Sequence, residues 1–92
     1  MESKKQLMEK AKLLEPNTRI GKNGITPSLI EEISKHLKRK RLVKVKMLSA
    51  FLDGKGKSFK KETAIKVAEM TGSELIDLTG FVFVLHKLEK QR

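Results

Sequence analysis

The chain has 92 residues, and its 21 Lys and Arg against 11 Asp and Glu give a formal net charge of +10. A chain of this length has room for one domain and one modest core, because small domains bury only about two thirds of the unfolded surface. The basic balance favours a polyanionic partner, and the absence of Cys excludes disulfides, thiolate metal sites and cysteine nucleophiles.

The first predicted element is a helix that begins after Ser3. Ser3 and Gln6 have the spacing of a capping box, and Pro16 ends the segment. Between them, apolar residues recur at helical spacing at Leu7, Met8, Ala11 and Leu14. The same segment opens with charges and has no continuous apolar run, so we expect neither a signal peptide nor a membrane anchor, and a cytoplasmic location.

A short extended stretch over residues 18–21 and a Gly-Lys-Asn-Gly turn over residues 21–24 follow this helix. Thr26 and Pro27 then have the order of a helix N-cap and a first helical residue. They predict a second helix that ends near residues 39–40. Its buried stripe is expected to comprise Leu29, Ile30, Ile33 and Leu37.

Residues 42–47 alternate between apolar residues and lysines, which is typical of a strand with one buried face. The face expected to be buried carries Val43, Val45 and Met47. Lys44 and Lys46 should then lie on the opposite face. We expect that face to be uncovered.

The C-terminal half begins with a flexible basic loop over residues 53–58. A third helix closed by Gly72 should follow, with apolar positions at Ala64, Ile65, Val67, Ala68 and Met70. Residues 74–79 and 81–86 flank Gly80 closely enough for an antiparallel hairpin. The second hairpin strand is apolar on both faces, as a central strand would be.

These elements give the order αβαβαββ and predict one α/β domain over residues 1–92. Within it, residues 87–92 are expected to form a frayed tail.

The turn between the first strand and the second helix is the strongest candidate for a binding site. Its glycines carry no Cβ atom, so the backbone can approach a ligand closely. The amides of Ser28 and Leu29 are expected nearby, at a helix N-terminus that favours phosphate. Lys22 adds a full charge, and the Asn23 amide could reach a ribose or a base edge. The alternative is a purely structural turn.

Residues 18–26 and 42–46, which read TRIGKNGIT and LVKVK, resemble the CRM domain family. Its name stands for chloroplast RNA splicing and ribosome maturation, and its single-domain prokaryotic members are the YhbY-like proteins. The resemblance implies a mixed four-stranded sheet with packed helices. It also implies RNA binding through a GxxG loop and neighbouring basic surface, in contact with ribosomal precursors or structured introns. Members often end the last strand in an aromatic residue, where this chain has His86.

Basic residues at the end of the second helix and on the following strand extend this surface. Cations stabilise a helix C-terminus without any ligand, but this cluster continues onto the strand. Lys55 and Lys57 are equally consistent with a solvated loop and with RNA contact. The predicted RNA-binding residues are Arg19, Gly21, Lys22, Asn23, Gly24, Lys35, Lys38, Arg39, Lys40, Arg41, Lys44 and Lys46.

The sequence offers no catalytic constellation. Residues 56–58 read Gly-Lys-Ser, but the glycine that a P-loop requires five positions earlier is Phe51. His36 and His86 have no ligand-spaced companions, and the serines have no evident base. We therefore predict no enzyme activity, no metal and no cofactor.

Two other functions stay open. The first is a DNA-binding architectural protein, which the charge equally allows, although no helix-turn-helix signature is present. The second is a protein-interaction module that docks on ribosomal proteins or another ribonucleoprotein component. Its apolar anchors would be Phe51, Leu52 and Phe59, if these are exposed.

Overall fold

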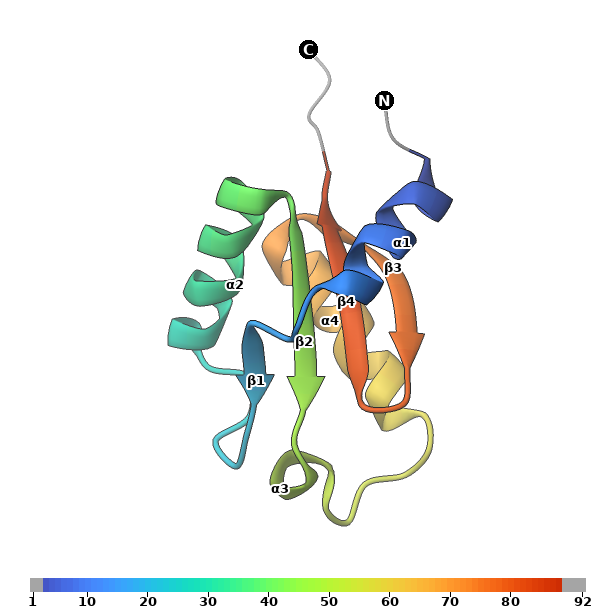
Figure 1. Cartoon of the computed structure of the whole chain (residues 1–92). Coiled ribbons are helices and arrows are strands. Elements are labelled where there is room, and N and C mark those ends of the chain that lie inside the picture. The colour runs from blue at the N-terminus through green and yellow to red at the C-terminus, as the bar shows by residue number, and fades with distance from the viewer. Residues whose placement is uncertain (1–2, 89–92) are drawn as a thin grey trace.

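A computed structural model describes residues 3–88 and arranges them as helices around one sheet (Figure 1). The elements are α1 (Lys4–Leu13), β1 (Thr18–Ile20), α2 (Pro27–Lys40), β2 (Leu42–Met47), α3 (Ser49–Leu52), α4 (Phe59–Thr71), β3 (Ser73–Thr79) and β4 (Val82–Lys87). The expected order is confirmed, with the short helix α3 added. No helix within the described residues is long and apolar enough to cross a membrane.

The sheet is mixed and four-stranded, with the strand order β1-β2-β4-β3. β1 runs parallel to β2, whereas β2 and β3 both pair antiparallel with β4. Helices α2 and α4 pack on one face, and α1 crosses the other (Figure 1). The α/β fold implied by the resemblance is therefore confirmed.

The main core lies between the sheet and the pair α2 and α4. The expected stripe of α2 is buried at Leu29, Ile33 and Leu37, and Ile30 packs against it while partly exposed. The alternation predicted for β2 is confirmed, because Val43, Val45 and Met47 are all buried in this core. Among the described residues, the largest fully buried side chain is Phe83 of the central strand β4.

A second, smaller apolar cluster lies on the opposite face of the sheet, beneath α1. It comprises Leu7, Ala11, Leu42 and Val84. The expectation that β2 is covered on one face only is therefore wrong. Leu7 and Ala11 of α1 are buried by packing against Leu42 and Val84 on this face.

The helix ends follow the signals in the sequence. The capping box of Ser3 and Gln6 is present, and the Thr26 hydroxyl accepts a hydrogen bond from the Leu29 amide at 3.1 Å. Helix α2 ends at Lys40, and Gly72 closes α4 in the left-handed conformation, with φ of 64°. Local sequence thus determines where these helices begin and end.

The apolar positions predicted for α4 are only partly buried. Ile65 is 41% exposed and Met70 is 51% exposed, whereas Thr63, Ala64, Val67 and Ala68 are buried. The helix predicted from these apolar positions is confirmed, and Ile65 and Met70 lie on its exposed side. These buried residues lie where α4 packs against α2 and against the sheet strand β3.

The C-terminal hairpin is confirmed around Gly80, whose φ is +60°. Phe81 lies in its turn and is 56% exposed, so the second strand begins one residue later than expected. That strand extends to Lys87, whose amide donates to the Arg41 carbonyl at 2.9 Å. The frayed tail therefore cannot begin at residue 87, and residues 89–92 lie outside the described residues.

Candidate nucleic-acid interface

The glycine turn closes on itself between β1 and α2. The Gly24 amide donates to the Gly21 carbonyl at 2.9 Å, which leaves Lys22 and Asn23 exposed at the tip. Gly24 has a φ of +72°, in the left-handed region, whereas Gly21 has no positive φ. Backbone conformation therefore requires glycine at position 24 only.

Helix α3 and the residue before it support the turn from below. A Cβ atom built on Gly21 would lie 3.6 Å from Leu48 Cδ1, and one on Gly24 would lie 3.7 Å from Phe51 Cε1. The Leu48 amide also donates to the Ile20 carbonyl at 2.9 Å. Four helical residues are too few to produce a periodic apolar pattern, so the sequence contains no signal for this support.

The start of α2 offers fewer amides than the sequence predicts. The Leu29 amide donates a hydrogen bond to the Thr26 hydroxyl at 3.1 Å, and the Ile30 amide donates to the Thr26 carbonyl at 3.0 Å. Pro27 has no N–H. Among the described residues, Ser28 therefore has the one amide in this first turn without an acceptor. The expected contribution of the Leu29 amide is wrong, because the helix cap uses it.

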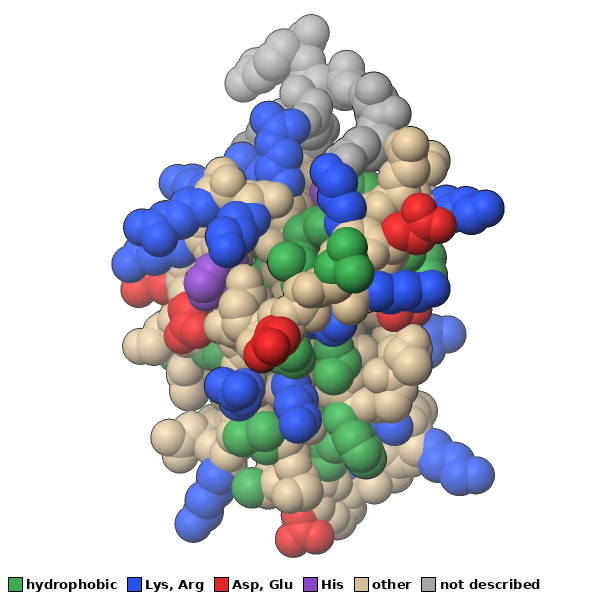
Figure 2. Space-filling view, viewed as in Figure 1, with side chains coloured by type: hydrophobic (Ala, Val, Ile, Leu, Met, Phe, Trp, Pro, Cys, Tyr) green, Lys and Arg blue, Asp and Glu red, His purple; other side chains and the backbone are tan. Residues whose placement is uncertain are grey.

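Arg19 and Lys46 form an exposed basic pair beside the turn. They are register partners on the parallel strands β1 and β2. Both point away from the main core, because their neighbours along each strand are buried. Figure 2 shows basic side chains on this face of the molecule, over β1 and β2.

Lys44 lies on the same face but has a different environment. Its ammonium donates to the carbonyls of Ala11 and Leu14, both at 3.0 Å, at the C-terminal end of α1. Its backbone is also tied to Asn17, whose side chain accepts from the Lys44 amide at 3.3 Å. Lys44 therefore anchors α1 to the sheet, whereas Lys46 extends into solvent.

The five predicted cations at the end of α2 are all exposed. They are Lys35, Lys38, Arg39, Lys40 and Arg41. Arg41 caps the helix in the left-handed conformation, with φ of 64°, and its amide donates to the Leu37 carbonyl at 2.8 Å. Figure 2 shows the resulting basic group at the end of α2.

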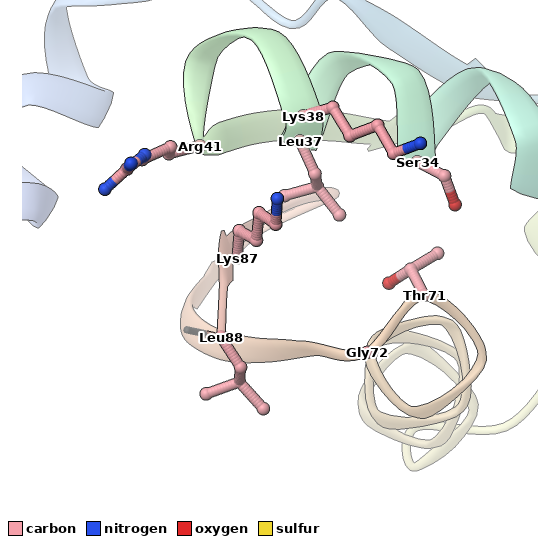
Figure 3. Close-up of a pocket in the computed structure, with 8 residues that line it drawn as sticks. All are labelled: Ser34, Leu37, Lys38, Arg41, Thr71, Gly72, Lys87 and Leu88. Carbon is pink, nitrogen blue, oxygen red and sulfur yellow. The ribbon is translucent and has the colours of Figure 1, made fainter. Parts of the chain in front are cut away.

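A hollow adjoins this group, between the C-terminal ends of α2 and α4 and the end of β4 (Figure 3). Its lining includes three cationic residues, Lys38, Arg41 and Lys87. Lys87 is an addition to the predicted set, since the sequence placed it in the tail. Its position depends on the antiparallel pairing of β4 with β2, a contact between distant parts of the chain.

The turn and this cluster are the opposite ends of one helix. Helix α2 has 14 residues and is therefore about 20 Å long. Glu31 and Glu32 are exposed on α2 between the two basic areas, and Figure 2 shows acidic side chains below the basic group. The predicted residues thus form two separate basic areas. They are not one continuous strip along the helix.

The apolar anchors suggested for a protein-interaction module are all partly covered. Phe51 and Leu52 are partly buried and pack against the main core, and Phe59 is half-buried. Within residues 3–88, no group of three or more His, Cys, Asp or Glu could hold a metal ion. His86 lies on β4 as the register partner of Leu42 and Glu74.

Known proteins resemble this chain in sequence and in fold. A model of the CRS1/YhbY (CRM) domain matches residues 1–87. A Methanocaldococcus jannaschii protein, named as a probable RNA-binding protein, is 34% identical over 84 residues, or 91% of this chain and 60% of that protein. The chain thus spans less than two thirds of that relative. The solution structure of a Staphylococcus aureus protein, described as a candidate RNA-binding protein, is 31% identical with a TM-score of 0.76. That match covers 96% of this chain and 86% of the other.

Proposed function

This chain belongs to the CRS1/YhbY (CRM) domain family, and we propose that it is a non-catalytic protein that binds RNA at the glycine turn. One observation carries the proposal: Lys22 and Asn23 are exposed on a supported turn, beside the exposed pair Arg19 and Lys46. The net charge of +10 and the names of the two relatives support RNA as the ligand.

Basic side chains and a backbone amide of the turn region would bind the phosphate groups of the RNA. Lys22, Arg19 and Lys46 supply positive charge that neutralises phosphates without reading sequence. The Ser28 amide adds a donor at the positive end of α2. Gly21 lets an RNA strand approach the main chain, since nothing projects from its Cα atom. Recognition by shape and backbone follows, with a strong dependence on salt.

The basic area at the end of α2 would contact a second part of the same RNA. It lies about one helix length, roughly 20 Å, from the turn. An RNA that reaches both areas must be structured or long, and it must avoid the carboxylates of Glu31 and Glu32. We therefore propose a structured RNA such as a ribosomal precursor, with ribosomal proteins as neighbours in the assembly.

Titrating labelled RNA and DNA hairpins of equal length against single charge-reversal variants tests this proposal. Lys22→Glu and Lys46→Glu should each weaken RNA binding by about tenfold or more, because each variant replaces attraction with repulsion at a phosphate. Lys61→Glu, at an exposed position on α4, is the control of equal charge. Equal losses in all three variants, or tighter binding of DNA, would contradict the proposal.

A further inference from the structure

A chain of contacts connects the glycine turn to the basic loop over residues 53–58. A Cβ atom built on Gly24 would lie 3.7 Å from Phe51 Cε1, so the Phe51 ring lies beside the turn. The Phe51 and Phe59 ring centroids are 5.0 Å apart at an angle of 42°. The Lys55 ammonium lies over the Phe59 ring, 5.3 Å from its centroid. The rings of Phe51 and Phe59 therefore form an aromatic surface that extends from the turn to the long, flexible side chain of Lys55.

The loop leaves the Lys55 side chain free to move while its backbone is held. The Lys55 amide donates to the Leu52 carbonyl at 3.0 Å, and the Phe59 amide donates to the Gly56 carbonyl at 3.2 Å. Residues 53–58 are all exposed, and Cβ atoms at Gly54 and Gly56 would meet nothing within 4 Å. The Lys55 ammonium can therefore leave the ring by side-chain rotation alone.

We propose that the Phe59 ring is a stacking site for an unpaired nucleobase, and that Lys55 moves from the ring to a neighbouring phosphate when RNA binds. The inference rests on the proposed function and names its ligand: a single-stranded nucleotide next to the phosphate held at the turn. Stacking of a base on an aromatic ring is stronger than an exposed cation–π contact. The released ammonium then gains a phosphate partner, so the exchange is favourable.

Phe51 is a positioning residue in this arrangement. It is half-buried, packs against the main core and pairs with the Phe59 ring, and a Cβ atom built on Gly24 would lie 3.7 Å from its ring. It thereby fixes the distance between the turn and the stacking surface. This explains why an aromatic pair, scarce in a chain with four Phe and no Tyr or Trp, lies beside the turn.

A single-tryptophan variant makes the stacking directly observable. The chain has no Trp or Tyr, so in Phe59→Trp the indole is the one strong intrinsic fluorophore. Adding a single-stranded RNA oligonucleotide should quench its emission, because a stacked base contacts the ring. An RNA duplex of the same length should quench less, since its bases are already stacked and paired.

Phe81 supplies a matched control. Its ring also lies under a lysine, with the Lys60 ammonium 4.9 Å from the centroid, but it lies in the β3–β4 turn. Because Phe51 pairs with Phe59 beside the glycine turn, Phe81→Trp should be quenched much less than Phe59→Trp. Phe59→Leu should reduce the affinity for single-stranded RNA by roughly 5- to 100-fold, the range expected when one base stack is removed. Its salt dependence should stay unchanged, because no charge is removed.

The measurements separate a failure of the proposed stacking site from a failure of the proposed RNA binding. If labelled RNA binds Phe59→Trp but its emission stays constant, or if Phe81→Trp is quenched equally, the stacking site is wrong and RNA binding stands. If the native chain binds no RNA, both proposals fail. Thermal melting of Phe59→Leu identifies a loss of folding, and in that case the tryptophan variants, which retain an aromatic ring, decide the question.

Discussion

Two lysines on β2 carry the same charge but lie in different surroundings. Lys44 donates two hydrogen bonds to the end of α1, whereas Lys46 is exposed beside Arg19. We predict that Lys44→Met lowers the free energy of unfolding by about 1–2 kcal/mol, because two carbonyls lose a charged donor. It should change RNA affinity little. Thermal melting and RNA titration measure the two effects.

Lys46→Met is the matched comparison, two residues along the same face of the strand. It should leave stability within about 0.5 kcal/mol, as exposed substitutions usually do, while weakening RNA binding severalfold. The assignment of Lys44 to the anchoring of α1 would be wrong if the two variants lost stability and affinity in the same proportion.

The two glycines of the turn should respond differently to alanine. Gly24 has a φ of +72°, so Gly24→Ala should destabilise the protein by about 1–2 kcal/mol. At Gly21 the added methyl group would meet Leu48 Cδ1 at 3.6 Å, an ordinary contact. Gly21→Ala should therefore melt close to the native temperature yet bind RNA more weakly, because the methyl group adds bulk to the backbone that we propose an RNA strand approaches. Unchanged affinity in Gly21→Ala would show that the strand does not approach at this residue.

For the helices and strands, local signals in the sequence predicted most of the fold. Caps at Ser3 and Thr26, the alternation of β2 and the glycine at the hairpin turn indicated elements close to those observed. The docking of α1 onto the second face of the sheet was not predictable. It depends on Leu7 and Ala11 meeting Leu42 and Val84, which are far apart in the sequence, and periodicity carries no information on such pairings.

The candidate site also contains features that the sequence indicates and features that only the structure shows. The tip residues of the turn and the cations ending α2 could be identified from residue type and position. Three features could not: the anchoring role of Lys44, the membership of Lys87 in the basic group, and the contact of Phe51 with the turn. Each of them joins residues that are brought together only by the sheet or by a helix too short to detect.

The end of α2 combines strain with charge. Arg41 adopts the left-handed conformation, which costs an ordinary residue about 1–2 kcal/mol relative to glycine. We predict that Arg41→Gly stabilises the protein by up to about 1 kcal/mol and weakens the binding of structured RNA, because the group then has one cation fewer. Denaturant unfolding and RNA titration test the two effects together. A stabilised variant with native affinity would show that Arg41 does not touch RNA.

For the molecule as a whole, the question is whether its two basic areas act on one RNA. Lys87 lines the same hollow as Lys38 and Arg41, so the charge control for the cluster that ends α2 must lie elsewhere. Lys61 and Lys66 on α4 are exposed and provide equal charge. Reversing the charge of two residues in each group gives two variants with the same net charge, so any difference in RNA affinity reports the position of the charges.

We predict that Lys38→Glu/Lys40→Glu weakens the binding of a long structured RNA by at least tenfold. It should barely affect a single-stranded oligonucleotide of about two nucleotides, which is too short to span the roughly 20 Å between the areas. The slope of log affinity against log salt should be several units for the long RNA. In the double variant it should fall by about 0.7–0.9 for each phosphate that the protein no longer neutralises. The Lys61→Glu/Lys66→Glu protein should keep most of the RNA affinity and most of the salt slope. If both double variants lost equal affinity for both RNAs, the attraction would be a property of the net charge, and neither area would be a site.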